Sequence, residues 1–243
     1  MKFLISASFA VVAIIAAGTA NAADLPLPYK ATPVLPAYSW QGFYIGANGG
    51  FAWGSSCWTF VDTVPPGLGG PSAAEGCHDP SGGVVGGQVG YDWQLSNWVL
   101  GLEAQGDWAS LQGQNVSAAF PTTTNRTRVD GLGLFTGRVG YAWSSALFYL
   151  KGGAAVVQNN YDFFGTLFGA PVSGGASQTR WGGTGGGGIE YKFTPNWSLA
   201  IEYDYVALGT SRLNFSTSLG VNTLEDINQN MNLVTARVNY SFP

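Results

Sequence analysis

The chain has 243 residues and a formal net charge of −4, with 14 acidic side chains against 10 basic ones. This balance excludes the basic surface that nucleic-acid binding requires. Charged residues make up only 10% of the chain, against about 25% in a typical soluble domain, while aromatic residues reach 14% and glycines number 36. We therefore expect a sheet that turns one of its faces toward lipid.

The N-terminus has the pattern of an export signal. Lys2 precedes an apolar run over residues 3–17, and the small residues Gly-Thr-Ala-Asn-Ala end at Ala22. This pattern predicts a signal peptide over residues 1–22, because the apolar run is shorter than the roughly 20 residues of a spanning helix. Residues 23–39 contain four prolines and are predicted to form an extended periplasmic linker. Residues 40–243 are predicted to be one barrel domain.

The chain has two cysteines, Cys57 and Cys77. An exported chain enters an oxidising compartment, so the two are predicted to form a disulfide. A zinc site is the competing interpretation, but two cysteines and the neighbouring His78 are too few ligands. We predict no metal and no cofactor.

A tyrosine recurs every fifty residues, at Tyr91, Tyr141 and Tyr191. Each tyrosine is followed two residues later by another aromatic, then by a polar break, then by a second apolar-rich run. This order predicts a strand, a short turn and a second strand, repeated around a sheet. Residues 238–242 repeat the tyrosine and the aromatic once more at the end of the series.

Eight runs of alternating character follow the linker, and the connections between them alternate in length. The short connections are predicted at residues 95–97, 144–146 and 194–196. The long connections are predicted at residues 54–81, 110–128, 158–178 and 210–228. With an even number of strands, both ends of the barrel lie on the side of the short turns, which in an outer-membrane barrel is the periplasm.

The placing of aromatic residues decides which face of the sheet meets lipid. A soluble barrel would turn its apolar face inward, but Phe43 and Trp53, like Trp98 and Trp108, stand ten residues apart on one face. Ten tilted strand residues span about 25 Å, the height of an outer-membrane apolar band between its aromatic girdles. The sequence thus predicts an all-β fold, an eight-stranded antiparallel up-and-down transmembrane β-barrel with short periplasmic turns and four longer outer loops. The predicted girdle comprises Phe43, Trp53, Trp93, Trp98, Trp108, Tyr141, Trp143, Phe148, Tyr191, Phe193, Trp197, Tyr240 and Phe242.

Most strand charges fall on the opposite, inward face. The predicted interior charge network comprises Asp92, Glu103, Asp107, Arg138, Lys151, Glu190, Lys192, Glu202, Asp204 and Arg237. One interpretation is a plug of mutually neutralising charges, because side chains just fill an eight-stranded barrel. The other is a conducting path, because glycines at inward positions such as Gly90 and Gly101 leave room for water.

His78 is the chain's single histidine. Outer-membrane hydrolases and acyltransferases need a histidine paired with a serine and an acid, so we predict no enzyme. We expect His78 to be solvated in the loop that holds the cysteines. The alternative is an axial haem ligand in a hemin-binding receptor, aided by loop tyrosines such as Tyr161.

Residues 39–46 read Ser-Trp-Gln-Gly-Phe-Tyr-Ile-Gly, and Asn-Gly-Gly follows at 48–50. Together with Ala-Ala-Asp-Leu-Pro at 22–26, the Gly-Tyr-x-Trp repeats and the ending at 237–242, this order resembles the small outer-membrane β-barrel surface antigens of alphaproteobacteria, the porin-family or RopB-type proteins. The resemblance implies an eight-stranded barrel of the OmpA type, inserted by the outer-membrane assembly machinery through the terminal aromatics Tyr240 and Phe242. Such proteins usually end on that aromatic, whereas Pro243 follows it here.

The expected function is that of a structural and surface-exposed protein of the Gram-negative outer membrane. Its roles would be envelope integrity and external contact through the loops, with lipid, lipopolysaccharide, and host or phage surfaces as partners. Two alternatives remain open at this point: a narrow porin for small solutes and a hemin-binding surface receptor.

Overall fold

The computed structural model of the chain describes residues 38–67, 70–167, 169–218 and 220–242. The predicted signal peptide, residues 23–37 of the predicted linker, and Pro243 lie outside the described residues. Within the described part of the chain, no helix is long and apolar enough to cross a membrane.

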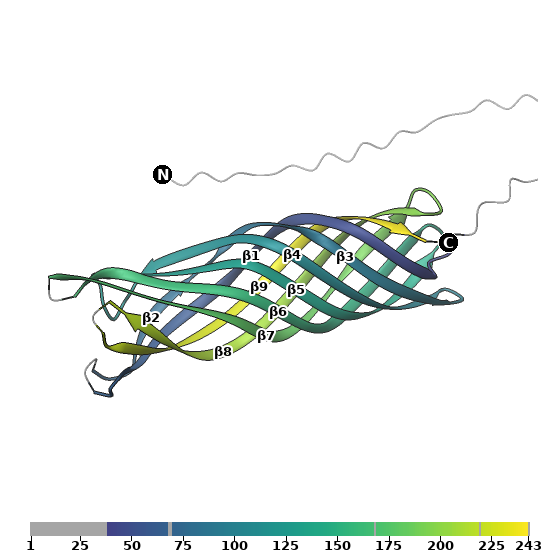
Figure 1. The fold of residues 1–243 in the computed structure, drawn as a ribbon. Helices are drawn as coiled ribbons and strands as arrows, with labels where there is room; N and C mark the ends of the chain where they lie inside the picture. The colour runs from purple at the N-terminus through teal and green to yellow at the C-terminus, as the bar shows by residue number, and fades with distance from the viewer. Residues whose placement is uncertain (1–37, 68–69, 168, 219, 243) are drawn as a thin grey trace, which may run out of the picture. The chain divides into compact units, whose positions relative to one another are not determined.

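Nine strands make up the described structure (Figure 1). They are β1 (Gly42–Val64), β2 (Ala73–His78), β3 (Ser81–Leu95), β4 (Trp98–Val116), β5 (Thr123–Trp143), β6 (Ala146–Leu167), β7 (Ala170–Lys192), β8 (Trp197–Thr217) and β9 (Asn222–Ser241). Eight of them are long, and the short β2 pairs only with the outer part of β1.

The eight long strands form a closed ring. Each pairs antiparallel with the next along the chain, and β1 pairs antiparallel with β9 from Tyr44↔Ser241 to Val64↔Asn222. Closure gives every strand of the ring a partner on both sides, which is the condition for strands to cross a lipid bilayer. The predicted eight-stranded antiparallel barrel is confirmed.

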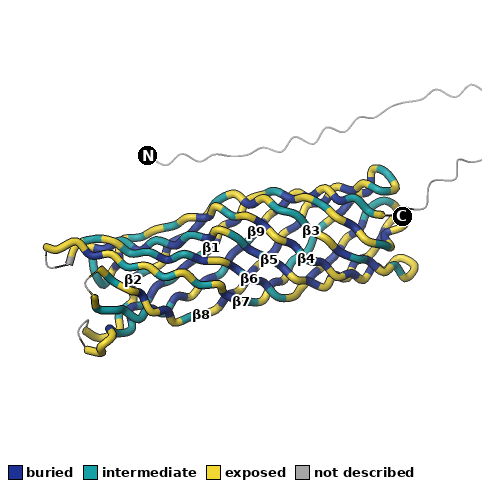
Figure 2. Tube along the Cα trace, viewed as in Figure 1, coloured by how far each residue is buried: buried dark blue, intermediate teal, exposed yellow. Residues whose placement is uncertain are grey.

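Burial alternates along each strand, as the change between dark blue and yellow along the tube shows (Figure 2). On β8, for example, Glu202 and Asp204 are buried while Ile201 and Tyr203 are exposed. Successive strand residues point to opposite faces of a sheet, so the exposed apolar side chains lie outside the barrel and the charged ones inside. This is the arrangement of a barrel that stands in lipid.

Two of the short turns contain only two residues between the paired strand ends. Leu95 pairs with Trp98, and Trp143 pairs with Ala146. The first turn residue, Ser96 or Ser144, has a positive φ of 57° or 56°. A left-handed first residue gives a hairpin turn whose twist matches that of the strands it joins.

The strands run further outward than the sequence pattern predicts. The predicted long connections are mostly strand, and the residues between strands are few: 65–72, 117–122, 168–169 and 218–221. The cause is an inversion of the alternation above the aromatic residues. There Arg126, Arg128 and Arg212 face outward, while Trp58 and Phe215 are buried. A barrel surrounded by water has its polar side chains outside and its apolar ones inside. A search for strands with an apolar outer face therefore misses this part of the barrel.

The Cys57–Cys77 disulfide is confirmed. The two cysteines are directly paired residues of β1 and β2. Because β3 starts only at Ser81, β2 takes its place beside the outer part of β1. The disulfide therefore fixes this substitute strand to the barrel wall.

Candidate functional site

The ten charged residues predicted to face inward are all buried in the barrel. Arg138 connects two of them on one side of the interior. Its Nε donates to Asp92 Oδ1 at 2.8 Å and its Nη1 lies 3.4 Å from Glu190 Oε2. The guanidinium also lies over the ring of Tyr44, 4.6 Å from its centroid. Each face of this cation is therefore in contact with a group that stabilises positive charge.

A second group of charges lies around Lys151. Its Nζ is 2.7 Å from Glu202, 3.3 Å from Glu103 and 3.4 Å from Asp204. The guanidinium of Arg237 donates to Glu103 and to Glu202. These five side chains, three acidic and two basic, are at most 1% exposed, so the two cations offset most of the acidic charge out of contact with water.

Two tyrosines extend this network and fill space that glycines leave. The Tyr44 hydroxyl donates to Glu103 and the Tyr149 hydroxyl donates to Glu202, each at 2.7 Å. Tyr44 lies against Gly90, and Tyr149 lies against Gly188. Side chains, rather than water, therefore occupy the room beside these two inward glycines.

An apolar layer crosses the barrel immediately outward of the charges. Along β9 the inward positions run from Arg237 through Leu233 and Met231 to Gln229. The members of this layer are Ala52, Val84, Leu111, Val129, Leu132, Leu134, Ala155, Val157, Val206, Leu208, Met231 and Leu233. They come from β1, β3, β4, β5, β6, β8 and β9, and Leu208 of β8 packs against Gly182 of β7. The layer is one apolar cluster, and it lies between the charge network and the outer end.

Trp40 closes the periplasmic end of the interior. It is 4% exposed and packs with Val99, Leu147 and Tyr149. Its ring lies 4.8 Å from Nζ of Lys192, which also donates to the carbonyl of Ser39 at 2.5 Å. The residues just before β1 thus fold into the mouth of the barrel, and nothing in the sequence pattern indicated this.

The predicted girdle residues lie on the outer surface of the barrel. Most of them are at least 40% exposed, and Tyr240 is half-buried. They concentrate at the periplasmic edge, where Trp98 packs on Tyr141 and Trp197 on Tyr240. At the outer edge Trp181 stands with Trp53 and Trp108, and sequence reasoning missed it because it lies between a predicted long connection and a run of glycines.

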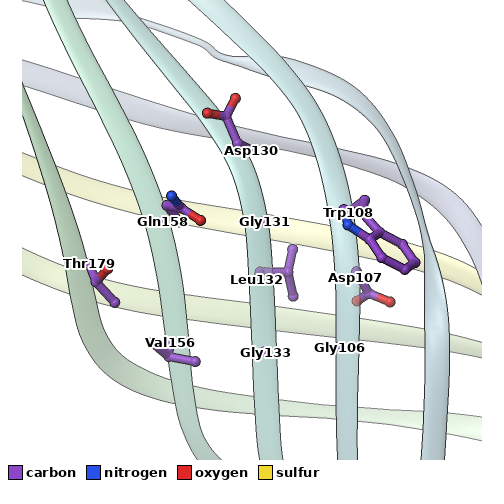
Figure 3. A pocket seen from close by; sticks show the side chains of 10 residues that line it. All are labelled: Gly106, Asp107, Trp108, Asp130, Gly131, Leu132, Gly133, Val156, Gln158 and Thr179. Atoms are coloured by element: carbon purple, nitrogen blue, oxygen red, sulfur yellow. The ribbon is translucent and has the colours of Figure 1, made fainter.

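Figure 3 shows the outer edge of this apolar surface, where Trp108 meets the polar side chains of Asp130, Gln158 and Thr179. Gly106, Gly131 and Gly133 leave a shallow hollow among them. Asp130 sits at a bulge in the pairing of β5 with β6 and accepts a hydrogen bond from Asn160. The hollow marks the height at which the outer face changes from apolar to polar.

His78 is not the solvated loop residue that the sequence suggests. It is 7% exposed, and its ring nitrogens lie 2.7 Å from Asn115 Oδ1 and 2.8 Å from Thr127 Oγ1. Burial lowers the pKa of its imidazole. Tyr161 is likewise no loop residue but is fully buried on β6. Both residues lie inside the outer extension of the barrel, which sequence reasoning took for loops.

Two carboxyl groups lie buried near the outer end. Glu75 accepts a hydrogen bond from Asn125, and burial raises the pKa of Glu75. Burial, reinforced by the charge of Glu75, raises the pKa of Glu225 to about 9. Glu225 is therefore protonated at neutral pH. In the described part of the chain, no group of three or more His, Cys, Asp or Glu residues could hold a metal ion.

Comparisons with known proteins agree with this geometry. The outer membrane protein beta-barrel domain family matches residues 8–242. The 31 kDa outer-membrane immunogenic protein of Brucella melitensis is 33% identical over 222 residues, covering 88% of this chain and 90% of that protein. The 22 kDa outer membrane protein of Rhizobium leguminosarum is 29% identical over 175 residues, covering 71% of this chain and 66% of that protein.

Solved structures are similar at lower identity. Neisserial surface protein A is 19% identical with a TM-score of 0.39, covering 83% of this chain and 97% of that chain. The outer membrane protease OmpT from Escherichia coli is 10% identical with a TM-score of 0.45 and the same coverage. The family match spans nearly the whole sequence, and the family resemblance expected from the residues is confirmed. The chain therefore belongs to the outer membrane protein β-barrel family and is a protein of the bacterial outer membrane.

Proposed function

We propose that the chain is a structural and surface-exposed barrel that supports envelope integrity and makes external contacts through its outer hairpins. The observation that carries this proposal is the contrast between the filled interior and the outer hairpins. The interior is filled by a charge network and an apolar layer. The outer hairpins continue as paired strands well beyond the aromatic residues Trp53 and Trp108, and they display polar side chains.

The outer hairpins offer the chemistry of a contact surface. Arg126 and Arg128 share Asp162 on the outer face of β5 and β6, leaving one positive charge in excess. Exposed arginines just outward of the apolar band suit the phosphate groups of lipopolysaccharide or an anionic surface of a host cell or phage. The outer-membrane assembly machinery is the partner proposed for Tyr240 and Phe242.

The filled interior argues against the narrow-porin alternative, because a conducting path would have to cross the apolar layer. The hydrogen bonds of His78 to Asn115 and Thr127 argue against a hemin receptor and against a hydrolase, since both ring nitrogens are already engaged with neutral groups. The proposal therefore includes no catalytic activity and no cofactor.

A complementation experiment tests this function. A strain that lacks the chain would receive either the full chain or a variant whose hairpins are cut back to the outer aromatic edge. Both should restore resistance to detergents, because both barrels fill the membrane, and only the full chain should restore adhesion to host cells. Restored uptake of small hydrophilic solutes, with no effect on detergent resistance or adhesion, would contradict the proposal and favour the porin.

A further inference from the structure

The barrel wall has an incompletely paired stretch between β7 and β8. The two strands pair from Lys192↔Ser198 to Gly183↔Ala207 and again at Gly175↔Ser216 and Gly174↔Thr217. Between described residues 176–182 of β7 and 208–215 of β8, no ladder pair forms. We call this stretch the β7–β8 seam. On its other edge, β7 remains paired with β6 over the same residues, and β8 remains paired with β9 from Gly209 outward.

The seam lies at the outer edge of the apolar band. Trp181, which belongs to the seam, is 65% exposed on the outer face. A bulge between Ala207 and Gly209 starts the seam on β8, and Gly209 has a positive φ of 66° that favours glycine. In an outer membrane this height corresponds to the headgroups of the outer leaflet.

Arg180 bridges the seam from inside the barrel. Its Nη2 donates to the carbonyl oxygens of Leu208 and Gly209, at 3.2 and 2.9 Å. Its Nη1 lies 3.2 Å from the hydroxyl of Tyr161 and 3.5 Å from Oε1 of Gln229. The guanidinium thus links β7 to two backbone oxygens of β8 within the seam.

Arg180 differs from the other buried arginines in having no anionic partner. It is 4% exposed, and among the described residues no carboxylate forms an ion pair with it, whereas Arg138 and Arg237 each have two. An uncompensated buried charge is costly, and neutral hydrogen-bond partners compensate it only in part. The site therefore favours an anionic partner.

Apolar side chains surround the position that such an anion would take. Outward of Arg180, the buried cluster of Trp58, Tyr161, Leu213, Phe215 and Ile227 fills the barrel. On the outer face, Trp181 flanks the seam. An occupant with an acidic head and an apolar chain would match both the cation and its surroundings.

We propose that the β7–β8 seam is a lateral binding site for an anionic amphiphile, whose phosphate or carboxylate head pairs with Arg180. No ladder pair joins the two strands over the seam, so their separation there has to break the Ser211–Gln178 hydrogen bond and the bonds of Arg180 to β8. The head group replaces the bonds that Arg180 makes to Leu208 and Gly209 and neutralises its charge. The apolar chain stays at the outer edge of the lipid band beside Trp181.

A comparison within the wall supports the choice of this stretch. Outward of Ser81↔Gln112, β4 lies next to β2 and is joined to it by hydrogen bonds from Asn115 Nδ2 and from the Ala118 backbone N–H to the Glu75 carbonyl. The bridging side chain there is neutral and next to an acidic residue, so that stretch offers no site for an anion.

The test uses the full chain refolded in micelles of a neutral maltoside detergent, with monododecyl phosphate as the probe. Saturable shifts of the probe's phosphorus resonance give its dissociation constant. We expect one site in the wild-type chain and binding at least about tenfold weaker in Arg180→Gln, since a charge-assisted contact contributes more than the 1.4 kcal/mol that tenfold represents. Arg212 lies on the outer side of the same seam and is paired there with Asp226, so Arg212→Gln tests which of the two arginines holds the head group: binding should be unchanged in that variant, and equal weakening in both variants would overturn the assignment to Arg180.

A second variant keeps Arg180 and tests whether β7 and β8 must separate at the seam for the head group to reach it. Ser211 donates to Gln178 across the seam at 3.0 Å, so the two side chains face each other, and the cysteines of the pair Gln178→Cys and Ser211→Cys can be joined by a short bis-methanethiosulfonate cross-linker that reduction removes. The cross-linked variant should bind the probe at least about tenfold more weakly, and reduction should restore binding. Reduced wild-type chain controls for the simultaneous opening of Cys57–Cys77.

Three further results would overturn the proposal: equal affinity in Arg180→Gln, equal affinity in the cross-linked variant, or inorganic phosphate binding as tightly as the amphiphile. Phosphatidic acid added to the micelles distinguishes the two sources of the head group. Competition with the probe would assign the site to a resident membrane lipid. Absence of competition, with the dependence on Arg180 retained, would assign it to a single-chain amphiphile from solution.

Discussion

Replacing Arg237 by methionine should destabilise the barrel severely. Arg237 pairs with Glu103 and Glu202, and its side chain is fully buried. Without it, Lys151 alone faces Glu103, Glu202 and Asp204, so the interior would hold an excess of buried negative charge. Removing one partner of a buried ion pair costs about 3–5 kcal/mol, because it leaves the other charge uncompensated.

The free energy of unfolding is measured by urea titration of the full chain refolded into phosphatidylcholine vesicles, with the heat-dependent gel shift as the check of folding. Arg212→Met is the matched control. Arg212 makes a comparable two-point contact with Asp226 but is 58% exposed, and an exposed pair contributes at most about 1 kcal/mol. The difference between the two variants therefore reports burial and not the loss of an arginine as such.

The double variant Arg237→Met, Glu202→Gln should recover part of the loss, since it also removes one of the unpaired carboxylates. If Arg237→Met and Arg212→Met lowered the free energy of unfolding equally, water would have to reach the charges. The reasoning about a dry interior would then be wrong.

Three further variants have defined outcomes. The Cys57→Ser, Cys77→Ser variant should lose about 3 kcal/mol, as expected for closing a loop of this size, and limited proteolysis should then cut at residues 65–72 while the barrel keeps its gel shift. Trp40→Ala should lower the free energy of unfolding by about 3–5 kcal/mol through the cavity it leaves, which a urea titration measures, yet it should not start conductance because the outer layers remain. Glu225 has a pKa of about 9 in the folded chain, above its unfolded value, so the stability it contributes is complete at low pH and is lost as pH rises toward 9. Glu225→Gln should thus be more stable than the wild type by up to about 3 kcal/mol at pH 7 and should show a smaller change between pH 5 and pH 9 in urea titrations.

The membrane part of the fold follows from local patterns in the sequence. The tyrosines 91, 141 and 191 mark three strand ends at the periplasmic side, and the parity they set places Glu202 and Arg237 inside. The two-residue period of the side chains and the regular short turns are enough to predict these positions. Along a strand with lipid outside and charges inside, apolar and charged residues alternate clearly.

Other features could not be predicted because the local pattern there is weak or inverted. Leu132 and Leu134 lie inside while Phe135 lies outside, so both faces of β5 are apolar where the apolar layer crosses, and the alternation disappears. Further outward, Trp58 and Tyr161 are buried and the outer face is polar. Because an apolar outer face was expected of every strand, this part of the sequence was interpreted as loops. The β7–β8 seam is a missing set of nonlocal hydrogen bonds, for which a single strand carries no signal.

Planar-bilayer conductance of the refolded chain tests the central claim, that the interior is closed, most directly. The charge network, the apolar layer and Trp40 together predict a membrane with no current steps, although the gel shift shows folded protein. Discrete and reproducible current steps from the wild-type chain would contradict the closed interior and would make the porin the better account.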